Sequence, residues 1–199
     1  MGNCASILNM LRKVGLEAQI SLSASDINAS KAYILPGVGA FDNCIQKIKK
    51  SGMLDLLEDM VINHEKPFLG ICLGMQMLFE SSEEGNESGL GWLNGVVKRF
   101  DTSKMEPSKR VPHMGWNFVK SSGDNQLFNE LHDQNRFYFV HSFHATCYDP
   151  SDELAVAHHG YDFTCGVQRK NIVGVQFHPE KSHRFGMLFF KNFSKLITC

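Results

Sequence analysis

Long apolar runs are missing from this chain of 199 residues. No stretch approaches the ~20 consecutive apolar residues that a membrane-spanning helix needs, and no basic segment followed by a hydrophobic one opens the chain. An excess of charge is missing too, because 20 basic and 21 acidic residues leave a formal net charge of −1. Such a balance gives no reason to expect nucleic acid or an anionic membrane as a partner. We therefore expect a cytoplasmic protein with neither partner.

Patterned cysteines are absent as well. The chain has six cysteines, but none shows the CxxC spacing of a metal site, and an unpatterned set fits a reducing compartment better than a disulfide scaffold. His158 and His159 are adjacent, so in a strand they point to opposite faces and do not readily share an ion, and a third correctly spaced ligand is lacking. We expect no metal and no cofactor. Five cysteines are interpreted as small packed hydrophobes: Cys4, Cys44, Cys147, Cys165 and Cys199.

The sixth cysteine stands in a different setting, within residues 67–84 (PFLGICLGMQMLFESSEE). A short apolar run leads through Gly70 and Cys72 into an amphipathic segment that we expect to be helical. Glycines on both sides of a residue permit the strained backbone of a sharp strand-to-helix turn, as in a nucleophile elbow. The first amides of the following helix favour negative charge, and therefore the reactive thiolate. The pattern predicts a catalytic role for Cys72.

The rest of the first half alternates strands and helices. Residues 1–15 predict a helix, residues 17–21 and 31–35 short strands joined by a polar connector at 23–30, and residues 41–50 and 53–63 two further helices. Glycine-rich residues 36–40 (PGVGA) follow the second strand and can offer backbone N–H groups to a ligand. This alternation predicts an α/β fold with a mostly parallel central sheet, helices on both faces, and the functional site at the carboxyl ends of the strands.

The second half, beyond Gly89, has shorter apolar runs between turn residues. Strands are predicted at 92–100, 117–120, 136–143, 153–159, 163–168 and 172–177, which indicates a more antiparallel C-terminal half. A helix over residues 183–197 closes the chain. No repeat or linker divides the sequence, and its 43% hydrophobic and 21% charged content is that of an ordinary globular chain. We expect residues 1–199 to form a single domain.

A cysteine nucleophile needs a base, and the chain has nine histidines. His178 is the best candidate because His178-Pro179-Glu180 directly follows the predicted strand at 172–177, and so reaches the same edge of the sheet as Cys72. Proline between the two polar residues fixes one backbone angle. Glu180 can then accept a hydrogen bond from one ring nitrogen and stabilise the imidazolium.

Five segments together resemble a known family. GICLGMQ at 70–76 and GVQFHPEKS at 174–182 resemble class I glutamine amidotransferases of the triad type. LPGVGAFD at 35–42, VPHMGWN at 111–117 and YFVHSF at 138–143 bring the resemblance closest to the glutaminase subunits of imidazole glycerol phosphate synthases. The resemblance covers nearly the whole chain.

The resemblance implies hydrolysis of the side-chain amide of L-glutamine. The Cys72 thiolate attacks the carboxamide carbon, His178 passes a proton to the departing ammonia, and water then releases glutamate from a γ-glutamyl thioester. Glu180 orients His178. An oxyanion hole is implied at the Leu73 N–H and in the loop at Gly37, through a backbone N–H of Val38 or Gly39, and in this family the loop completes the hole only when a partner is engaged.

Further residues are implied to hold glutamine. Gln76 follows Cys72 by one helical turn, Glu84 faces the ammonium group, and the backbone of Gly39, Ser142 and Phe143 completes the site. Ordinary solvated polar side chains are the alternative for Gln76 and Glu84. The family often has tyrosine where this chain has Phe143, which matters little because that contact is made by the backbone.

A partner is also implied. The family docks on a (β/α)₈-barrel cyclase or synthase as a heterodimer and passes ammonia to it through a tunnel, so that imidazole glycerol phosphate is made in histidine biosynthesis. Residues assigned to this interface are His113, Met114, Trp116, Asn117 and Lys181. Trp116 is the expected anchor because tryptophan is enriched in interface hot spots, with a core position as the alternative.

One departure and three alternatives stay open. Family members begin with a strand and a DYGMGN turn, whereas this chain starts at the tail of that turn, so the usual first strand is expected to be missing. A close alternative is a paralogous subunit that supplies ammonia to a sugar amidotransferase in surface-polysaccharide biosynthesis. A γ-glutamyl peptidase is disfavoured by the PGVG and PHMGWN segments. An inactive amidotransferase-like interaction module is disfavoured by intact Cys72, His178 and Glu180.

Overall fold

The computed structural model describes residues 4–131 and 135–197 of the chain. Within these ranges one large sheet has the order β1-β2-β11-β10-β8-β4-β3, with β9 beside β10 and β6 beside β9, while β5 and β7 pair separately. The strands of the large sheet are β1 (Tyr33–Gly37), β2 (Phe68–Cys72), β3 (Ser81–Ser82), β4 (Gly95–Arg99), β6 (Lys120–Ser121), β8 (Phe143–Cys147), β9 (Glu153–His158), β10 (Asp162–Arg169) and β11 (Ile172–Val175). The separate pair is β5 (His113–Phe118) and β7 (Arg136–His141).

Strand pairing divides the molecule into two halves. β1 and β11 lie on either side of β2 and run parallel to it, whereas β10 pairs antiparallel with β11, β8 and β9. The predicted α/β class, with a parallel part followed by a more antiparallel half, is confirmed. Among the described residues β2 is the only strand paired with β1, which therefore stands at the end of the sheet order.

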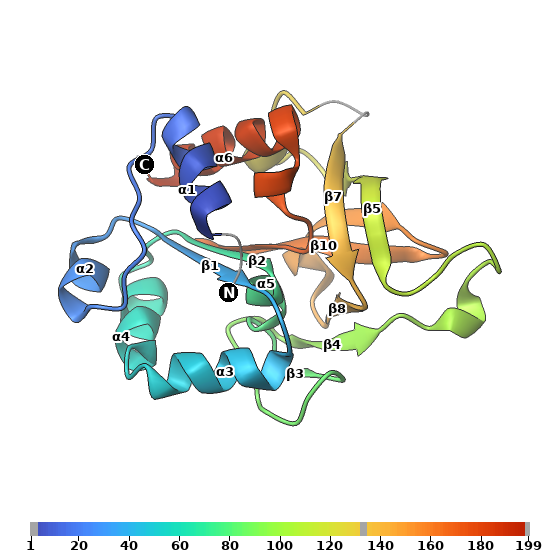
Figure 1. Cartoon of the computed structure of the whole chain (residues 1–199), viewed down its shortest axis with the longest axis horizontal. Coiled ribbons are helices and arrows are strands. Elements are labelled where there is room, and N and C mark those ends of the chain that lie inside the picture. Colours follow the sequence, from blue (N-terminus) through green and yellow to red (C-terminus); the bar gives the residue numbers. More distant parts are fainter. Residues whose placement is uncertain (1–3, 132–134, 198–199) are drawn as a thin grey trace.

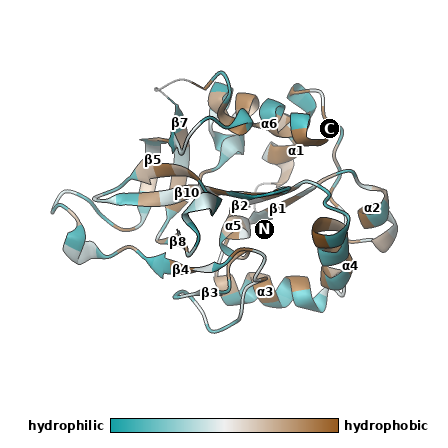
Figure 2. Cartoon of the chain, turned by 180° about the vertical axis from the view of Figure 1, so that it is seen from behind, coloured by the Kyte–Doolittle hydropathy of each residue, from teal (hydrophilic) through white to brown (hydrophobic). Residues whose placement is uncertain are grey.

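Helices cover both faces of the parallel part, as the alternation predicted (Figure 1). α1 and α6 lie on one face, and α3, α4 and α5 lie on the other. The helices are α1 (Cys4–Lys13), α2 (Ala24–Ala29), α3 (Phe41–Lys50), α4 (Leu54–Glu58), α5 (Leu73–Gln76) and α6 (His183–Ile197). α3, α4 and α6 carry both hydrophobic and hydrophilic residues, as expected of amphipathic helices over a sheet (Figure 2).

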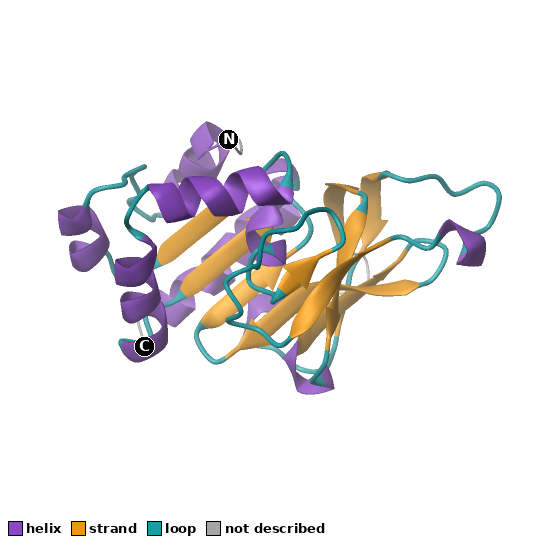
Figure 3. Cartoon of the chain, turned by 90° about the horizontal axis from the view of Figure 1, so that it is seen from below, coloured by secondary structure: helices purple, strands orange, loops and turns teal. Residues whose placement is uncertain are grey.

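The core follows from this layering. Ile7, Leu11 and Phe189 pack with Leu69 and Ile71 of β2 on the α1/α6 face. On the other face the buried residues of α3 meet those of the α5 segment, namely Phe41, Ile45, Leu73 and Met77. Burying one large apolar side chain contributes about 2 kcal/mol, so β2, with all five residues buried, is held firmly between both layers. The antiparallel half lies to one side of the helices (Figure 3).

Several predicted elements are confirmed, two of them with their bounds. α3 and α6 occupy the predicted residues 41–50 and 183–197. The predicted helix at 53–63 is helical but divided, because α4 continues into a π-helical turn at Asp59–Asn63.

Three expectations for the first half of the chain are wrong, and in the second half the strands predicted at 117–120 and 136–143 are each interrupted, at Val119 and Ser142. Residues 17–21 form no strand; Ile20 is 67% exposed, so the stretch has no sheet face to bury. The connector at 23–30 contains helix α2, capped by the Ser23 side chain, which accepts a hydrogen bond from the Asp26 N–H. The helix after the elbow ends at Gln76 instead of running toward Glu84, because the chain turns there to bury Leu78 and Phe79.

Candidate active site

Cys72 occupies the apex of a strained turn. It is the last residue of β2, precedes the first residue of α5, and has φ 55° and ψ −109°. A positive φ is uncommon for a residue with a Cβ atom, and such strain concentrates at functional sites. The side chain is 8% exposed, so the thiol is sheltered but reachable.

Three glycines make this turn possible. A Cβ atom on Gly70 would lie 2.6 Å from the Gly74 carbonyl oxygen, and one on Gly74 would lie 1.8 Å from the Leu35 carbonyl oxygen. A Cβ atom on Gly37 would lie 2.7 Å from the Gly74 nitrogen. The PGVG loop after β1 is therefore packed directly against the first turn of α5. Only glycine permits this approach, and it brings Val38 and Gly39 to the cavity in front of Cys72.

His178 and Glu180 form a buried pair beside the cysteine. His178 Nδ1 lies 2.8 Å from Glu180 Oε1, and both side chains are 3% exposed. The His178 N–H donates to the Tyr138 carbonyl at 2.8 Å. Ser182 Oγ donates to the His178 carbonyl and accepts from the Tyr138 N–H. The turn that carries the pair is therefore fixed to strand β7.

The electrostatic setting keeps His178 charged. Burial lowers the pKa of His178, but hydrogen bonding and the charges of Cys72 and Glu180 more than compensate and raise it to about 9. His178 Nε2 is buried and makes no well-formed hydrogen bond with the described residues, and Glu180 Oε2 is likewise unpaired. An imidazolium between a thiol and a carboxylate stabilises the thiolate and holds a proton ready for transfer.

A cavity of about 330 Å³ opens in front of Cys72. Its lining brings together residues from both halves of the molecule: Val38, Gly39, Cys72, Leu73, Gln76, Glu84, Pro112, Val140, His141, Ser142, Phe143 and His178. All of the residues to which sequence assigned catalysis or glutamine binding line this cavity, except Gly37 and Glu180. Glu180 instead lines a second cavity, of about 350 Å³, which lies between α1 and α6 and contains no cysteine.

Gln176 is a site residue that sequence analysis missed. It is fully buried, its Nε2 donates to Cys72 Sγ at 3.5 Å, and its Oε1 accepts from Gln76 Nε2 at 2.9 Å. Gln76 Nε2 also donates to the Phe143 carbonyl at 3.2 Å. Gln176 directly follows β11 and stands two residues before His178, so its place in the GVQFHPEKS segment was the available signal.

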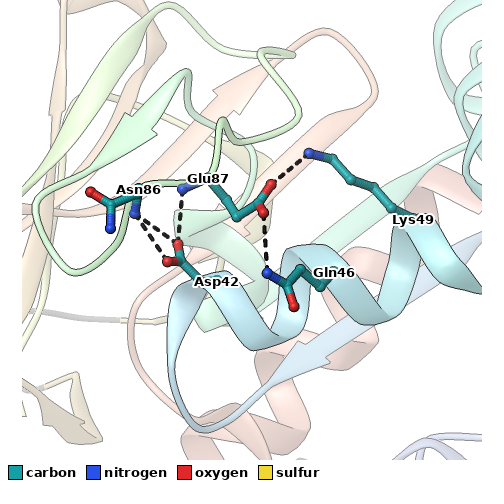
Figure 4. Close-up of polar contacts among 5 residues, drawn as sticks. All are labelled: Asp42, Gln46, Lys49, Asn86 and Glu87. Atoms are coloured by element: carbon teal, nitrogen blue, oxygen red, sulfur yellow. Dashed lines mark hydrogen bonds and ion pairs between the residues drawn. The ribbon is translucent and has the colours of Figure 1, made fainter.

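Asp42 is a second residue that was missed, although it belongs to the LPGVGAFD segment. Its carboxylate accepts hydrogen bonds from the N–H groups of Asn86 and Glu87, and these bonds lower its pKa. Glu87 in turn accepts bonds from Lys49 and Gln46 (Figure 4). The loop that carries Glu84 is thereby tied to the start of α3, directly after the PGVG loop.

Glu84 has the environment of a cation-binding group. Burial raises the pKa of Glu84, although a hydrogen bond from the Phe41 N–H lowers it. No ion pair among the described residues includes this carboxylate. A half-buried carboxylate at a cavity favours a positively charged ligand group.

Strand β5 carries four of the five residues assigned to an interface, and they alternate. Met114 and Trp116 are 63% and 45% exposed, so Trp116 is not a core residue. His113 is only 4% exposed; its side chain faces inward and is not available for a surface contact. Asn117 is half-buried, and Lys181, close in space, lies over the Tyr138 ring at 5.5 Å. Phe118, which sequence analysis did not select, is 55% exposed on the Trp116 side.

The remaining cysteines differ from Cys72. Cys4, Cys44, Cys147 and Cys165 are free thiols, and Cys199 lies outside the described residues. Burial raises the pKa of Cys147 to about 12 and that of Cys165 well above its usual value. These two thiols are therefore unreactive hydrophobes. Within the described ranges no group of three or more histidine, cysteine or acidic residues is arranged to hold a metal ion, and no helix is long and apolar enough to cross a membrane.

Comparison with known proteins gives the family. Residues 2–196 match the model of the glutamine amidotransferase class-I family. Imidazole glycerol phosphate synthase subunit HisH 2 of Pseudomonas aeruginosa is 48% identical over 197 residues, which cover 99% of this chain and 96% of that protein. The corresponding subunit HisH of Leptospira borgpetersenii is 44% identical over 98% of this chain and 96% of its own length. A crystal structure of a glutamine amidotransferase shares the fold, with a TM-score of 0.72 at 19% identity over 100% of this chain and 95% of that one. The chain belongs to the class-I glutamine amidotransferase family.

Proposed function

We propose that this chain is the glutaminase subunit of an imidazole glycerol phosphate synthase, which hydrolyses L-glutamine and passes ammonia to a cyclase subunit in histidine biosynthesis. The observation that carries the proposal is a strained Cys72 that lines one cavity together with His178, whose ring is bonded to the buried Glu180 carboxylate. Relatives with names of such subunits, at 43–48% identity over nearly the whole chain, support it.

The proposed mechanism begins with the Cys72 thiolate. It attacks the carboxamide carbon of glutamine, and the carbonyl oxygen becomes an oxyanion that is stabilised by the Leu73 N–H and a backbone N–H of Val38 or Gly39. Removing one such donor typically costs about 10²–10³-fold in rate. His178 gives its proton to the leaving nitrogen, so ammonia departs and a γ-glutamyl thioester remains. His178 then accepts a proton from water, which hydrolyses the thioester to glutamate.

Glutamine is proposed to bind between charged and backbone groups. Glu84 pairs with its ammonium group, because burial without a cationic partner leaves this carboxylate in need of one. Gln76 and the backbone of Gly39, Ser142 and Phe143 hold the remaining polar groups. Asp42 has a supporting role, since it fixes the segment that follows Glu84.

The partner is proposed to be a (β/α)₈-barrel cyclase that docks on β5. Met114, Trp116 and Phe118 form an exposed apolar row there, and Lys181 lies at its side, one residue after Glu180. Tryptophan is a frequent interface anchor, and phenylalanine and methionine are also enriched at interfaces. A tunnel in the partner would carry ammonia away before it becomes the non-nucleophilic ammonium ion.

A second candidate differs only in the acceptor of ammonia. The name of the Pseudomonas aeruginosa relative carries the number 2, which indicates a second such subunit in that organism. The second candidate is therefore a paralogous subunit that supplies ammonia to a sugar amidotransferase. That subunit would use the same cysteine, histidine and glutamate.

The test mixes the chain with a cyclase subunit and its nucleotide substrate, and measures glutamate and imidazole glycerol phosphate together. The proposal expects the two products in equal amounts, and it expects Cys72→Ala to form the imidazole product only when free ammonia is added. Glutamate release without the imidazole product would overturn the histidine-pathway assignment and favour the paralogue. Absence of glutamate release with every acceptor would overturn the glutaminase.

A further inference from the structure

Four histidines lie together beneath strand β5, around the Phe100 ring. They are buried and come from three strands and the turn after β9: His113, His141, His144 and His159. The catalytic chemistry uses none of them. Two of them are joined by a hydrogen bond, since His113 Nδ1 lies 2.9 Å from His141 Nε2. Because buried polar groups are costly unless they are satisfied, this pair has a defined arrangement.

The hydrogen-bond partners at the two ends of this pair, the Phe143 carbonyl and the Asn117 amide, determine which ring nitrogens carry protons. His141 Nδ1 lies 2.7 Å from the Phe143 carbonyl oxygen, which can only accept, so Nδ1 carries the proton. Asn117 Oδ1 accepts from the Phe118 N–H at 2.8 Å, which identifies Asn117 Nδ2 as the donor 3.1 Å from His113 Nε2. His113 Nε2 is therefore a bare acceptor, and His113 Nδ1 donates to His141 Nε2. Every donor meets an acceptor.

Neither ring can take a second proton without breaking this order. A proton on His113 Nε2 would face the Asn117 amide protons, and one on His141 Nε2 would face the His113 Nδ1 proton. Burial agrees with this, because it lowers the pKa of His113 to about 3 and that of His141 well below its usual value. Both rings are neutral and both are of the Nδ1–H tautomer.

The chain of bonds continues into the cavity of Cys72. The Phe143 carbonyl that accepts from His141 also accepts from Gln76 Nε2 at 3.2 Å. The other proton of that amide goes to Gln176 Oε1, and Gln176 Nε2 donates to Cys72 Sγ. An unbroken series of oriented bonds thus leads from Asn117 on β5 to the catalytic thiol.

We propose that His113 and His141 are positioning residues that hold the glutamine-binding Phe143 backbone in a fixed relation to strand β5. This rests on the proposed function, which gives Phe143 a substrate contact and β5 the docking surface. A carbonyl held by an imidazole from one side and an amide from the other keeps one orientation. Asn117, at the outer end, stands between Trp116 and Phe118, so a partner that sets the position of β5 also sets that carbonyl.

The first test reads the tautomers directly on the full chain. ¹⁵N NMR of the histidine rings is expected to show a protonated Nδ1 and a bare Nε2 for both His113 and His141, assigned by the loss of signals in His113→Phe and His141→Phe. An Nε2–H tautomer or a doubly protonated ring at either residue would overturn the proposal. This readout does not require activity, so it is independent of the proposed function.

The second test measures glutamine hydrolysis with the cyclase subunit docked. His113→Phe is expected to raise the KM for glutamine about ten-fold, the effect of losing one buried hydrogen bond, with a change of kcat less than about two-fold because Cys72 and His178 are untouched. His159→Phe is the matched control, since His159 stacks on His113 but bonds to the Arg110 carbonyl outside the series; its KM should stay at the parent value.

Equal KM values for the parent and His113→Phe, or equal increases in His113→Phe and His159→Phe, would overturn the positioning role. Failure of the proposed function gives a different result, because the parent chain itself would then release no glutamate while the ring tautomers remained as inferred.

Discussion

The parallel layer β1-β2-β11 and the separate pair β5–β7 hold their residues in different ways. In the parallel layer, backbone segments contact each other directly at Gly37, Gly70 and Gly74. These contacts fix the turn at Cys72, and a Cβ atom at any of the three glycines would clash with them. In β5, outward and inward residues alternate, so the apolar side chains of Met114, Trp116 and Phe118 face solvent while His113 faces the core. The difference teaches that backbone geometry holds the proposed nucleophile in place. Side chains, by contrast, form the proposed docking surface and link it to the cavity. Mutations in the parallel layer should therefore impair catalysis and stability, whereas mutations in β5 should mainly impair docking.

The largest expected effect is loss of the nucleophile. Cys72→Ala should lower glutamate release by about 10⁴-fold or more, since removing the nucleophile of a triad removes covalent catalysis. The melting temperature should change little, because alanine is smaller and fits the same turn. Cys4→Ala, in helix α1 and away from the cavity, is the matched control and should keep the parent rate. A Cys72→Ala chain with normal turnover would assign the nucleophile elsewhere.

The next effect is on the acid–base pair and is seen in the pH dependence. Since the pKa of His178 is raised to about 9, kcat should fall as pH rises through about 9 and His178 loses its proton. Glu180→Gln removes one of the groups that raise this pKa, so the alkaline fall should move to lower pH, and kcat should drop about 10²-fold or more as His178 loses its orienting group. Profiles of kcat against pH for both chains check this; an unmoved alkaline limb would contradict the role of Glu180.

A third prediction compares the two regions through their glycines. Gly74→Ala places a Cβ atom 1.8 Å from the Leu35 carbonyl oxygen, and should cost about 3 kcal/mol of unfolding free energy, because both segments must move. Gly115→Ala in β5 meets no atom within 4 Å and has only its φ of +127° to accommodate, so about 1 kcal/mol is expected. Urea unfolding of both variants measures these losses of unfolding free energy. Equal losses would contradict the distinction between the two regions.

The smallest effect concerns docking. Trp116→Ala should weaken binding of the cyclase subunit about thirty-fold, or about 2 kcal/mol, as expected of an interface anchor. Turnover of the free chain should not change, because Trp116 lies outside the cavity. Tyr148→Ala removes an aromatic side chain that is 62% exposed outside the β5–β7 pair and should leave the affinity unchanged. Titration calorimetry distinguishes the two variants, and equal affinities would place the interface elsewhere.

Sequence predicted the local parts of this molecule well. The elbow at Cys72 follows from adjacent glycines, and the bounds of α3 and α6 follow from apolar periodicity and end signals. Residues 17–21 were mistaken for a strand because local composition does not say whether a partner strand exists. The inward direction of His113 was missed because it depends on pairing with His141, 28 residues away. The capping pair Ser23 and Asp26 was a local signal for α2 that was overlooked.

Contacts between distant segments account for the rest. Gln176 meets Gln76 across 100 residues, and Asp42 meets Glu87 across 45. No periodicity joins such residues, because register and packing bring them together only after the sheet has formed. The resemblance supplied the proposed roles of residues at the cavity, but it did not indicate the series of hydrogen bonds behind them.

The most direct test of the central claim is to trap the intermediate on the thiol. The chain and its cyclase subunit are mixed with glutamine, quenched in acid within the first turnovers, digested and analysed by mass spectrometry. The account predicts a γ-glutamyl thioester on the peptide that carries Cys72 and none on the peptides with Cys44, Cys147 or Cys165. Glutamate release at the full rate with no adduct on Cys72, or with the adduct on another cysteine, would contradict it.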